Sequence, residues 1–155
     1  MYQLTGEYEC KMDKKGRLRL PTSIIRQIGA GILSFTLNRG FEKNLMLYPK
    51  EVWDSKTKEI NQLNIYNTKQ RQALRYFYRG ATTLTLDSAD RILLPKSLIE
   101  YAELSQDLVL FAYHEQIEIW SKENYEAIIA AEPEDFSVIA DEIFGNVKLN
   151  GSDET

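Results

Sequence analysis

An internal repeat is the feature that most limits how this chain of 155 residues can fold. Residues 6–21, GEYECKMDKKGRLRLP, align with residues 80–95, GATTLTLDSADRILLP, at a constant offset of 74 positions. A second match, at an offset of 72, relates LMLYPKEVW at 45–53 to IEIWSKENY at 117–125. We therefore expect two copies of one structural unit. The identical pairs of the first match are Gly6 and Gly80, Asp13 and Asp87, Arg17 and Arg91, Leu20 and Leu94, and Pro21 and Pro95.

Each copy has the pattern of a β-β-α-β-β unit, in which β-rich runs surround a polar turn and form an opening hairpin. Pro21 and Pro95 end the second strand of each copy, because proline has no N–H for a strand ladder. Short helices are then predicted at 22–28 and 96–102. The predicted strands cover 9–12, 18–20, 34–37 and 45–48 in the first copy, and 82–86, 92–94, 108–111 and 117–120 in the second.

Helices are also predicted outside these strands. Residues 51–64 and 67–78 form a pair, the second opened by an Asn-x-x-Gln capping box at Asn67. Near the carboxyl end, apolar residues recur at helical spacing between Pro133 and Gly145. The expected organisation is a first repeat over 1–53, a helical spacer over 54–78, a second repeat over 79–126, a carboxyl-terminal helix over 127–145 and a flexible tail over 146–155.

Composition excludes several classes of protein. The chain is 43% hydrophobic and 27% charged, which is typical of a globular protein and not of a disordered one. It has no apolar run of the roughly 18 to 20 residues that a membrane helix needs, and its start lacks the apolar core of a secretion signal, so a cytoplasmic protein is expected. Cys10 and His114 are the single cysteine and histidine, which leaves no internal disulfide, no zinc ligand set and no expected cofactor.

The net charge of −4 conceals a gradient along the chain. Residues 1–40 hold seven basic and three acidic groups, whereas residues 121–155 hold two basic and nine acidic groups. The densest basic stretch has five cations in nine residues, and it is where an anionic ligand would bind. These cations are Lys11, Lys14, Lys15, Arg17 and Arg19.

An Asp-x-x-x-Arg pair occupies the same turn in both copies. In the first copy, Gly16 supplies the positive φ of a tight turn, and Asp13 can accept N–H bonds across the loop or pair with Arg17. A purely structural role for such a pair is one interpretation, since a surface Asp–Arg pair adds only ~0 to 1 kcal/mol. The recurrence of the pair beside a cluster of cations favours a functional role as well.

This double motif resembles the MraZ family, whose members are built of two SpoVT/AbrB-type repeats, each with Asp-x-x-x-Arg between a small-residue start and a proline exit. The resemblance spans residues 2 to about 144. It implies an α+β fold in which the copies interleave as a swapped-hairpin β-barrel of the AbrB type (double-psi-like), with packing helices. The matching residues are Asp13, Gly16, Arg17, Pro21, Tyr48, Pro49, Arg79, Gly80, Ala81, Asp87, Arg91, Pro95, Glu118, Ile119 and Trp120.

The resemblance also implies a function: a sequence-specific, DNA-binding transcriptional repressor of the division and cell-wall gene cluster. Such a protein would bind double-stranded DNA at promoter direct repeats as a ring-shaped homo-oligomer of more than two subunits, on the nucleoid. An enzyme is not expected, because His114 has no nucleophile or second acid placed beside it by a recognisable motif. The alternative is a ring-forming protein-interaction scaffold whose basic loop binds an acidic protein partner.

The expected DNA-binding residues are unequal between the copies. The first copy starts with LTGEY where the family has an Arg-Gly-Ala-like start, and Asp90 stands in the second copy where the family has glycine. Asp90 can keep the turn while lowering its positive potential. We therefore expect Arg17 to contact DNA and Arg91 mainly to hold its own turn through Asp87. The candidate DNA-binding residues are Lys11, Lys14, Lys15, Arg17, Arg19 and Arg91, with Asp13, Gly16 and Asp87 as turn residues.

Overall fold

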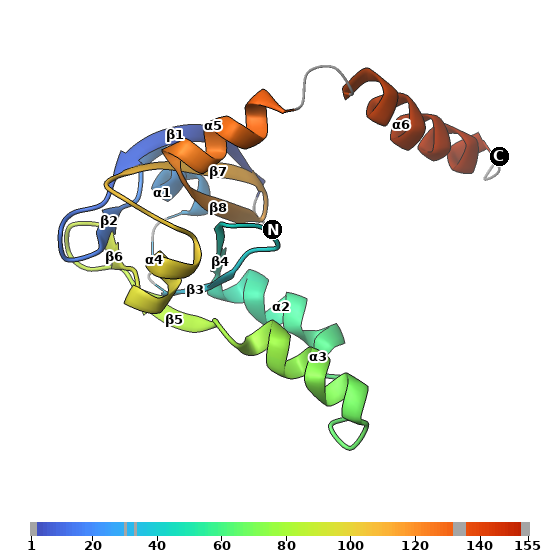
Figure 1. The fold of residues 1–155 in the computed structure, drawn as a ribbon, viewed down its shortest axis with the longest axis horizontal. Helices are drawn as coiled ribbons and strands as arrows, with labels where there is room; N and C mark the ends of the chain where they lie inside the picture. Colours follow the sequence, from blue (N-terminus) through green and yellow to red (C-terminus); the bar gives the residue numbers. More distant parts are fainter. Residues whose placement is uncertain (1–2, 30, 33, 132–135, 153–155) are drawn as a thin grey trace. The chain divides into compact units, whose positions relative to one another are not determined.

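The structure is a computed structural model that describes residues 3–29, 31–32, 34–131 and 136–152. Within these ranges it is a mixed α and β fold, as the repeat pattern predicts (Figure 1). Internal contacts divide the chain into two units, Met1–Lys122 and Glu123–Thr155. The first unit contains all the strands named below together with four of the helices.

The first unit is built on an antiparallel six-stranded sheet and a separate two-stranded ribbon. In spatial order the sheet contains β1 (Leu4–Lys11), β7 (Asp107–His114), β8 (Gln116–Ser121), β4 (Leu45–Pro49), β3 (Ser34–Arg39) and β5 (Thr82–Thr85). The ribbon contains β2 (Arg17–Arg19) and β6 (Arg91–Leu93).

Strands of one repeat pair with strands of the other. β1 pairs with β7, β2 with β6, β3 with β5 and β4 with β8. The expected opening hairpin is wrong for this reason: β1 and β2 form no ladder with each other, and each forms its ladder with a strand of the second copy. An isolated bridge joins Met12, directly after β1, to Leu18 of β2. No closed barrel is found among the described strands, since β1 and β5 each pair on one side of the six-stranded sheet. The swapped-hairpin barrel is therefore not confirmed.

The core lies between the sheet, the ribbon and two short helices. Leu18 and Ile92 of the ribbon and Phe35 and Ile117 of the sheet are completely buried in one apolar cluster. The helices α1 (Thr22–Ile28) and α4 (Lys96–Tyr101) start directly after Pro21 and Pro95, as predicted. They add Ile24, Ile28 and Leu98 to the same cluster.

Between the repeats, α2 (Lys50–Ile60) and α3 (Thr68–Tyr78) form a helical hairpin that projects from the sheet (Figure 1). The side chain of Asn67 accepts a hydrogen bond from the backbone N–H of Gln70, which confirms the predicted cap. Trp53 of α2 stacks on Phe77 of α3 with ring centroids 5.4 Å apart, so the indole packs within the hairpin. Helix α2 ends at Ile60, four residues before the end predicted at residue 64.

The second unit contains helices that sequence reasoning placed incompletely. Helix α5 (Lys122–Ala130) was not expected as a separate element, although it follows β8 as α2 follows β4. Helix α6 (Phe136–Ser152) continues through Gly145, where a stop and a frayed tail were expected. One glycine costs only about 1 kcal/mol in a helix, which is too little to end it. The part of the predicted helix at 132–135 lies outside the described residues.

No helix in the described ranges is long and apolar enough to cross a membrane.

Cross-repeat pairing predicts that the first repeat cannot fold alone as a monomer. A chain of residues 1–78 lacks β7, β6, β5 and β8, so every strand of the first repeat loses a ladder. We expect this fragment to be unfolded, or to fold only as a homodimer in which a second copy supplies the missing strands. Circular dichroism and amide NMR dispersion, with mass from sedimentation and the full chain as control, test this. A folded monomer would contradict it.

Candidate nucleic-acid interface

The ribbon of β2 and β6 presents basic side chains on one face. In the ladder, Arg17 lies opposite Leu93, Leu18 opposite Ile92, and Arg19 opposite Arg91. Successive side chains of a strand point to opposite faces, so burial of Leu18 and Ile92 turns the flanking residues outward. The outer face of this Arg ribbon therefore carries three arginines and Leu93, which is 58% exposed.

A hydrogen-bonded Asp–Arg pair closes the first turn. Asp13 Oδ1 accepts from the backbone N–H groups of Lys15 at 2.9 Å and of Arg17 at 2.8 Å. Asp13 Oδ2 accepts from Arg17 Nε at 2.6 Å. Gly16 has a φ of 84°, a left-handed conformation that favours glycine, as predicted. One carboxylate thus fixes both the loop backbone and the guanidinium.

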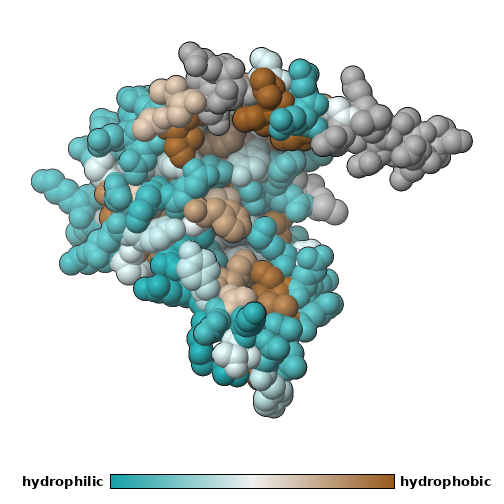
Figure 2. Space-filling view, turned by 45° about the vertical axis from the view of Figure 1, so that its right-hand side comes forward, coloured by the Kyte–Doolittle hydropathy of each residue, from teal (hydrophilic) through white to brown (hydrophobic). Residues whose placement is uncertain are grey.

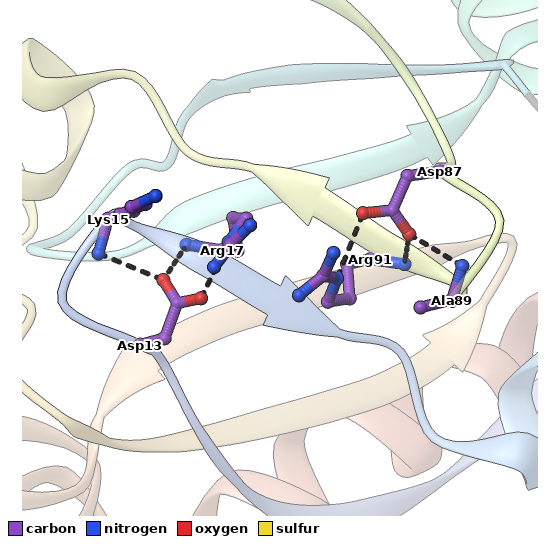
Figure 3. Close-up of polar contacts among 6 residues, drawn as sticks. All are labelled: Asp13, Lys15, Arg17, Asp87, Ala89 and Arg91. Atoms are coloured by element: carbon purple, nitrogen blue, oxygen red, sulfur yellow. Dashed lines mark hydrogen bonds and ion pairs between the residues drawn. The ribbon is translucent and has the colours of Figure 1, made fainter.

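The second turn has the same geometry with different side chains. Asp87 Oδ1 accepts from the backbone N–H groups of Ala89 at 2.8 Å and Arg91 at 2.9 Å, and its Oδ2 accepts from Arg91 Nε at 2.9 Å. Asp90 occupies the position of Gly16 with a φ of 58°, so the aspartate takes the left-handed conformation as predicted. Figure 3 shows the two turns at opposite ends of the antiparallel ribbon, with both arginines between them.

Hydrogen bonding lowers the pKa of both aspartates. For Asp13 the main cause is the backbone N–H of Arg17, and the guanidinium of the same residue acts in the same direction. For Asp87 the main cause is the backbone N–H of Arg91. Both carboxylates are therefore ionised at neutral pH, and each restrains one arginine on the ribbon.

The arginines of the ribbon keep donors for an outside acceptor. The carboxylates bind Nε of Arg17 and Arg91, and the Nη groups make no hydrogen bond to the described residues. Arg19 lies directly opposite Arg91, and like charges at directly opposed positions of a ladder are destabilising. An anion above this face would relieve the repulsion and accept from the guanidinium groups.

The predicted lysines lie in different places around the ribbon. Lys14 and Lys15 are exposed in the first turn, where they line a hollow of about 780 Å³. Lys11 is at the end of β1, opposite Asp107 in the ladder, and belongs to the sheet. Lys96 of α4 also lines the hollow and was missed by sequence reasoning. The sequence held one signal for Lys96: it directly follows Pro95, at the position that Thr22 occupies after Pro21 in the first repeat.

The two ends of the ribbon differ in charge although their turns match in geometry. Lys14 and Lys15 of the first turn correspond to Ser88 and Ala89 of the second. Arg19 of the first copy corresponds to Leu93 of the second, at the same offset. The positive side chains are therefore concentrated in the first copy.

Other reactive side chains lie away from any comparable arrangement. His114 is exposed at the end of β7, beside the tight turn into β8. Burial raises the pKa of the Cys10 thiol to about 11, so this thiol is a poor nucleophile at neutral pH. Among the described residues, no group of three or more His, Cys, Asp or Glu could hold a metal ion.

The lowered pKa values predict a stability difference that depends on pH. A carboxyl group with a depressed folded pKa stabilises the fold above its unfolded pKa, and this contribution is lost as pH falls through the folded pKa. Asp13→Asn and Asp87→Asn should each lower the free energy of unfolding at pH 7, and the deficit should shrink as the pH is lowered below about 4. Urea unfolding across this range measures it. A deficit that stays constant down to about pH 2 would contradict the assignment.

Comparison with known proteins adds an independent line of evidence. A family model described as "MraZ protein, putative antitoxin-like" matches residues 3–76 and again 77–147, so it matches the chain twice. A protein of Christiangramia forsetii named transcriptional regulator MraZ is 35% identical over 97% of this chain and 99% of its own length. One of the same name from Flavobacterium psychrophilum is 38% identical over 95% of each chain. A third, from Dictyoglomus thermophilum, is 37% identical over 78% of this chain and 81% of its own. With two matched repeats and relatives aligned over most of their length, the chain belongs to the MraZ family.

Proposed function

We propose that this chain is a transcriptional regulator that binds double-stranded DNA through the Arg ribbon. The observation that carries the proposal is the position of Arg19 opposite Arg91, on an exposed face bounded by two Asp-held turns. Such a face costs stability in the free protein and suits a polyanion. The names of the relatives, which are transcriptional regulators, support the same conclusion.

The size of the ribbon suits the major groove of DNA. Two paired strands of three residues extend about 10 Å, and the major groove is about 12 Å wide and admits a two-stranded ribbon. The free Nη groups of Arg17 can donate two hydrogen bonds to O6 and N7 of a guanine. Lys14 and Lys15 in the turn would contact phosphates, which position the ribbon without reading the base sequence.

The first copy supplies most of the proposed contacts. Its turn carries two lysines, and Arg19 extends the same positive face. In the second copy, Asp90 adds a second acidic residue to the turn that Asp87 closes, which lowers the positive potential near Arg91. Arg91 therefore acts mainly in holding its own turn. Lys11, on the sheet, would contribute through its long-range charge.

Binding by a single ribbon would be weak on a subunit with a net charge of −4, so assembly is part of the proposal. A ring of more than two subunits would place several ribbons along one duplex and raise the effective concentration of each. Exposed apolar side chains on α6, including Phe136 and Ile143, offer surface for association. The finer features rest on family membership: repression of the division and cell-wall gene cluster, promoter direct repeats as operator, and a cytoplasmic location on the nucleoid.

The proposal predicts salt-dependent DNA binding by an oligomer. Binding to the region upstream of the protein's own gene should weaken linearly on a log–log plot against salt, and Lys14→Ala or Lys15→Ala should each reduce the slope by about one unit, because one phosphate is no longer neutralised. Fluorescence anisotropy across a salt series, with the mass of each complex measured, provides the test. Lys69→Ala on α3 is the matched control and should leave the slope unchanged. Binding to acidic proteins without binding to DNA would favour the scaffold alternative.

The proposal also predicts that replacing Arg17 and replacing Arg91 have different effects. Arg17→Ala should weaken DNA binding by ~1 to 3 kcal/mol and relax base preference if the guanidinium contacts a guanine. Arg91→Ala should mainly lower stability or change assembly, because its guanidinium holds the second turn. Competition with operator variants, alongside urea unfolding and light scattering, separates these effects. Equal losses of affinity with both variants stable and fully assembled would exclude the asymmetry.

A further inference from the structure

A second cavity lies apart from the Arg ribbon, where the β3–β4 turn faces the α2–α3 hairpin. Its volume is about 380 Å³, within the range of about 300 to 1,000 Å³ that is usual for small-molecule sites. Met46, Ile60 and Leu63 contribute apolar surface, and the rings of Tyr48 and Phe77 also line it. Figure 2 shows apolar surface on the lower part of the molecule, where the helical hairpin leaves the sheet, bordered by hydrophilic side chains.

Two cations line this cavity without carboxylate partners. The guanidinium carbon of Arg39 lies 4.7 Å from the ring centroid of Tyr101 and 5.6 Å from that of Tyr76. The Nζ of Lys56 lies 5.5 Å from the ring centroid of Tyr48. Within the described part of the chain, neither cation forms an ion pair, and no Asp or Glu lines the cavity. The lining of this cavity therefore carries positive charge and no negative charge, while Glu42 and Glu118 line the adjoining hollow that Lys56 also borders.

The position of Arg39 is fixed from several sides. The Oδ1 of Asn38, a buried residue, accepts from the backbone N–H of Arg39 at 2.8 Å, and its Nδ2 donates to the carbonyl oxygen of Phe77 at 2.9 Å. The aliphatic stem of Arg39 lies against Gly80, where an added Cβ would come within 2.6 Å of Arg39 Cγ. The matched glycine of the second repeat is thus the residue that leaves room for this arginine.

Tyr101 holds the turn at the rim of the cavity. Its hydroxyl donates to the carbonyl oxygens of Gly40 and Glu42, at 2.9 and 3.1 Å, while its ring supports the Arg39 guanidinium. The guanidinium carbon of Arg39 lies over both tyrosine rings, and no described residue accepts a hydrogen bond from the guanidinium, so its N–H groups remain available to a ligand. A guanidinium binds a carboxylate or phosphate through two parallel N–H donors.

We propose that this cavity is a binding site for a small aromatic ligand that carries one carboxylate or phosphate group. The aromatic walls would stack on the ring of the ligand, and the pair of Arg39 and Lys56 would bind its anionic group. The apolar floor disfavours ligands with several charges, since their further charges would be desolvated without partners. This site is separate from the Arg ribbon and does not depend on DNA binding.

The test uses 8-anilinonaphthalene-1-sulfonate, an aromatic anion that fluoresces on binding, with the full-length protein. We expect one saturable site per chain. Arg39→Gln or Lys56→Gln should each weaken the affinity for the probe by about tenfold or more. Lys43→Gln is the matched control, because Lys43 Nζ lies 5.2 Å from the ring centroid of Tyr101 but does not line the cavity. Gly80→Ala should also weaken binding by displacing Arg39, and circular dichroism confirms that each variant is folded.

Uncharged N-phenyl-1-naphthylamine distinguishes the proposal from general apolar binding, since it should bind more weakly and be insensitive to Arg39→Gln. Displacement of the sulfonate by indole-3-acetate would support a carboxylate ligand, and displacement by AMP would support a phosphate ligand. The proposal fails if neither displaces the probe, or if Arg39→Gln and Lys56→Gln bind it as the unmodified protein does. It also fails if the site disappears as subunits associate, because a second copy then covers the cavity.

Discussion

The pairing of β2 with β6 is the constraint on which the rest of the structure depends. Each strand has only three residues and comes from a different repeat, and so short a ribbon is not stable alone. Complete burial of Leu18 and Ile92 anchors it to the core, and an aspartate closes the turn at each end. Because the buried pair must face inward, the arginines must face outward. The exposed positive face is therefore a direct consequence of how the core is packed.

Comparison of the two turns shows which of their residues the fold requires and which can vary. Both copies keep an aspartate that accepts two backbone N–H groups and one guanidinium N–H. The left-handed position is satisfied by Gly16 in one copy and by Asp90 in the other, two residues that reach this conformation for different reasons. Loop charges are free of this requirement, which is why the two turns keep one geometry while they differ in charge.

The Arg ribbon and the aromatic cavity are connected by a single strand. β5 pairs with β3, which ends at Arg39 in the cavity, and β5 leads through Leu86 into the turn of Asp87. Gly80, just before β5, makes room for the stem of Arg39. Gly80 and Gly6 are matched between the repeats but have different neighbours. Gly80 leaves room for Arg39 at the cavity, whereas Gly6 lies beside the ring of Tyr8.

The sequence by itself determined the local features of this protein. Proline stops, the Asn67 cap and the Asp-x-x-x-Arg turns depend on residues only a few positions apart, so their geometry could be predicted, as could the positive φ of Gly16. The family resemblance implied that the copies interleave, but the strand partners and the open sheet depend on contacts between distant residues, from 45 positions apart for Leu37 and Thr82 to 110 for Leu4 and His114. Only the tertiary structure decided that Arg19 lies opposite Arg91, that Lys96 lines the same hollow as Lys14 and Lys15, and that the guanidinium of Arg39 lies near the rings of Tyr76 and Tyr101. The physical reason is that the packing of buried side chains sets the register and the partner of each strand. Neither can be predicted from the residues of one strand alone.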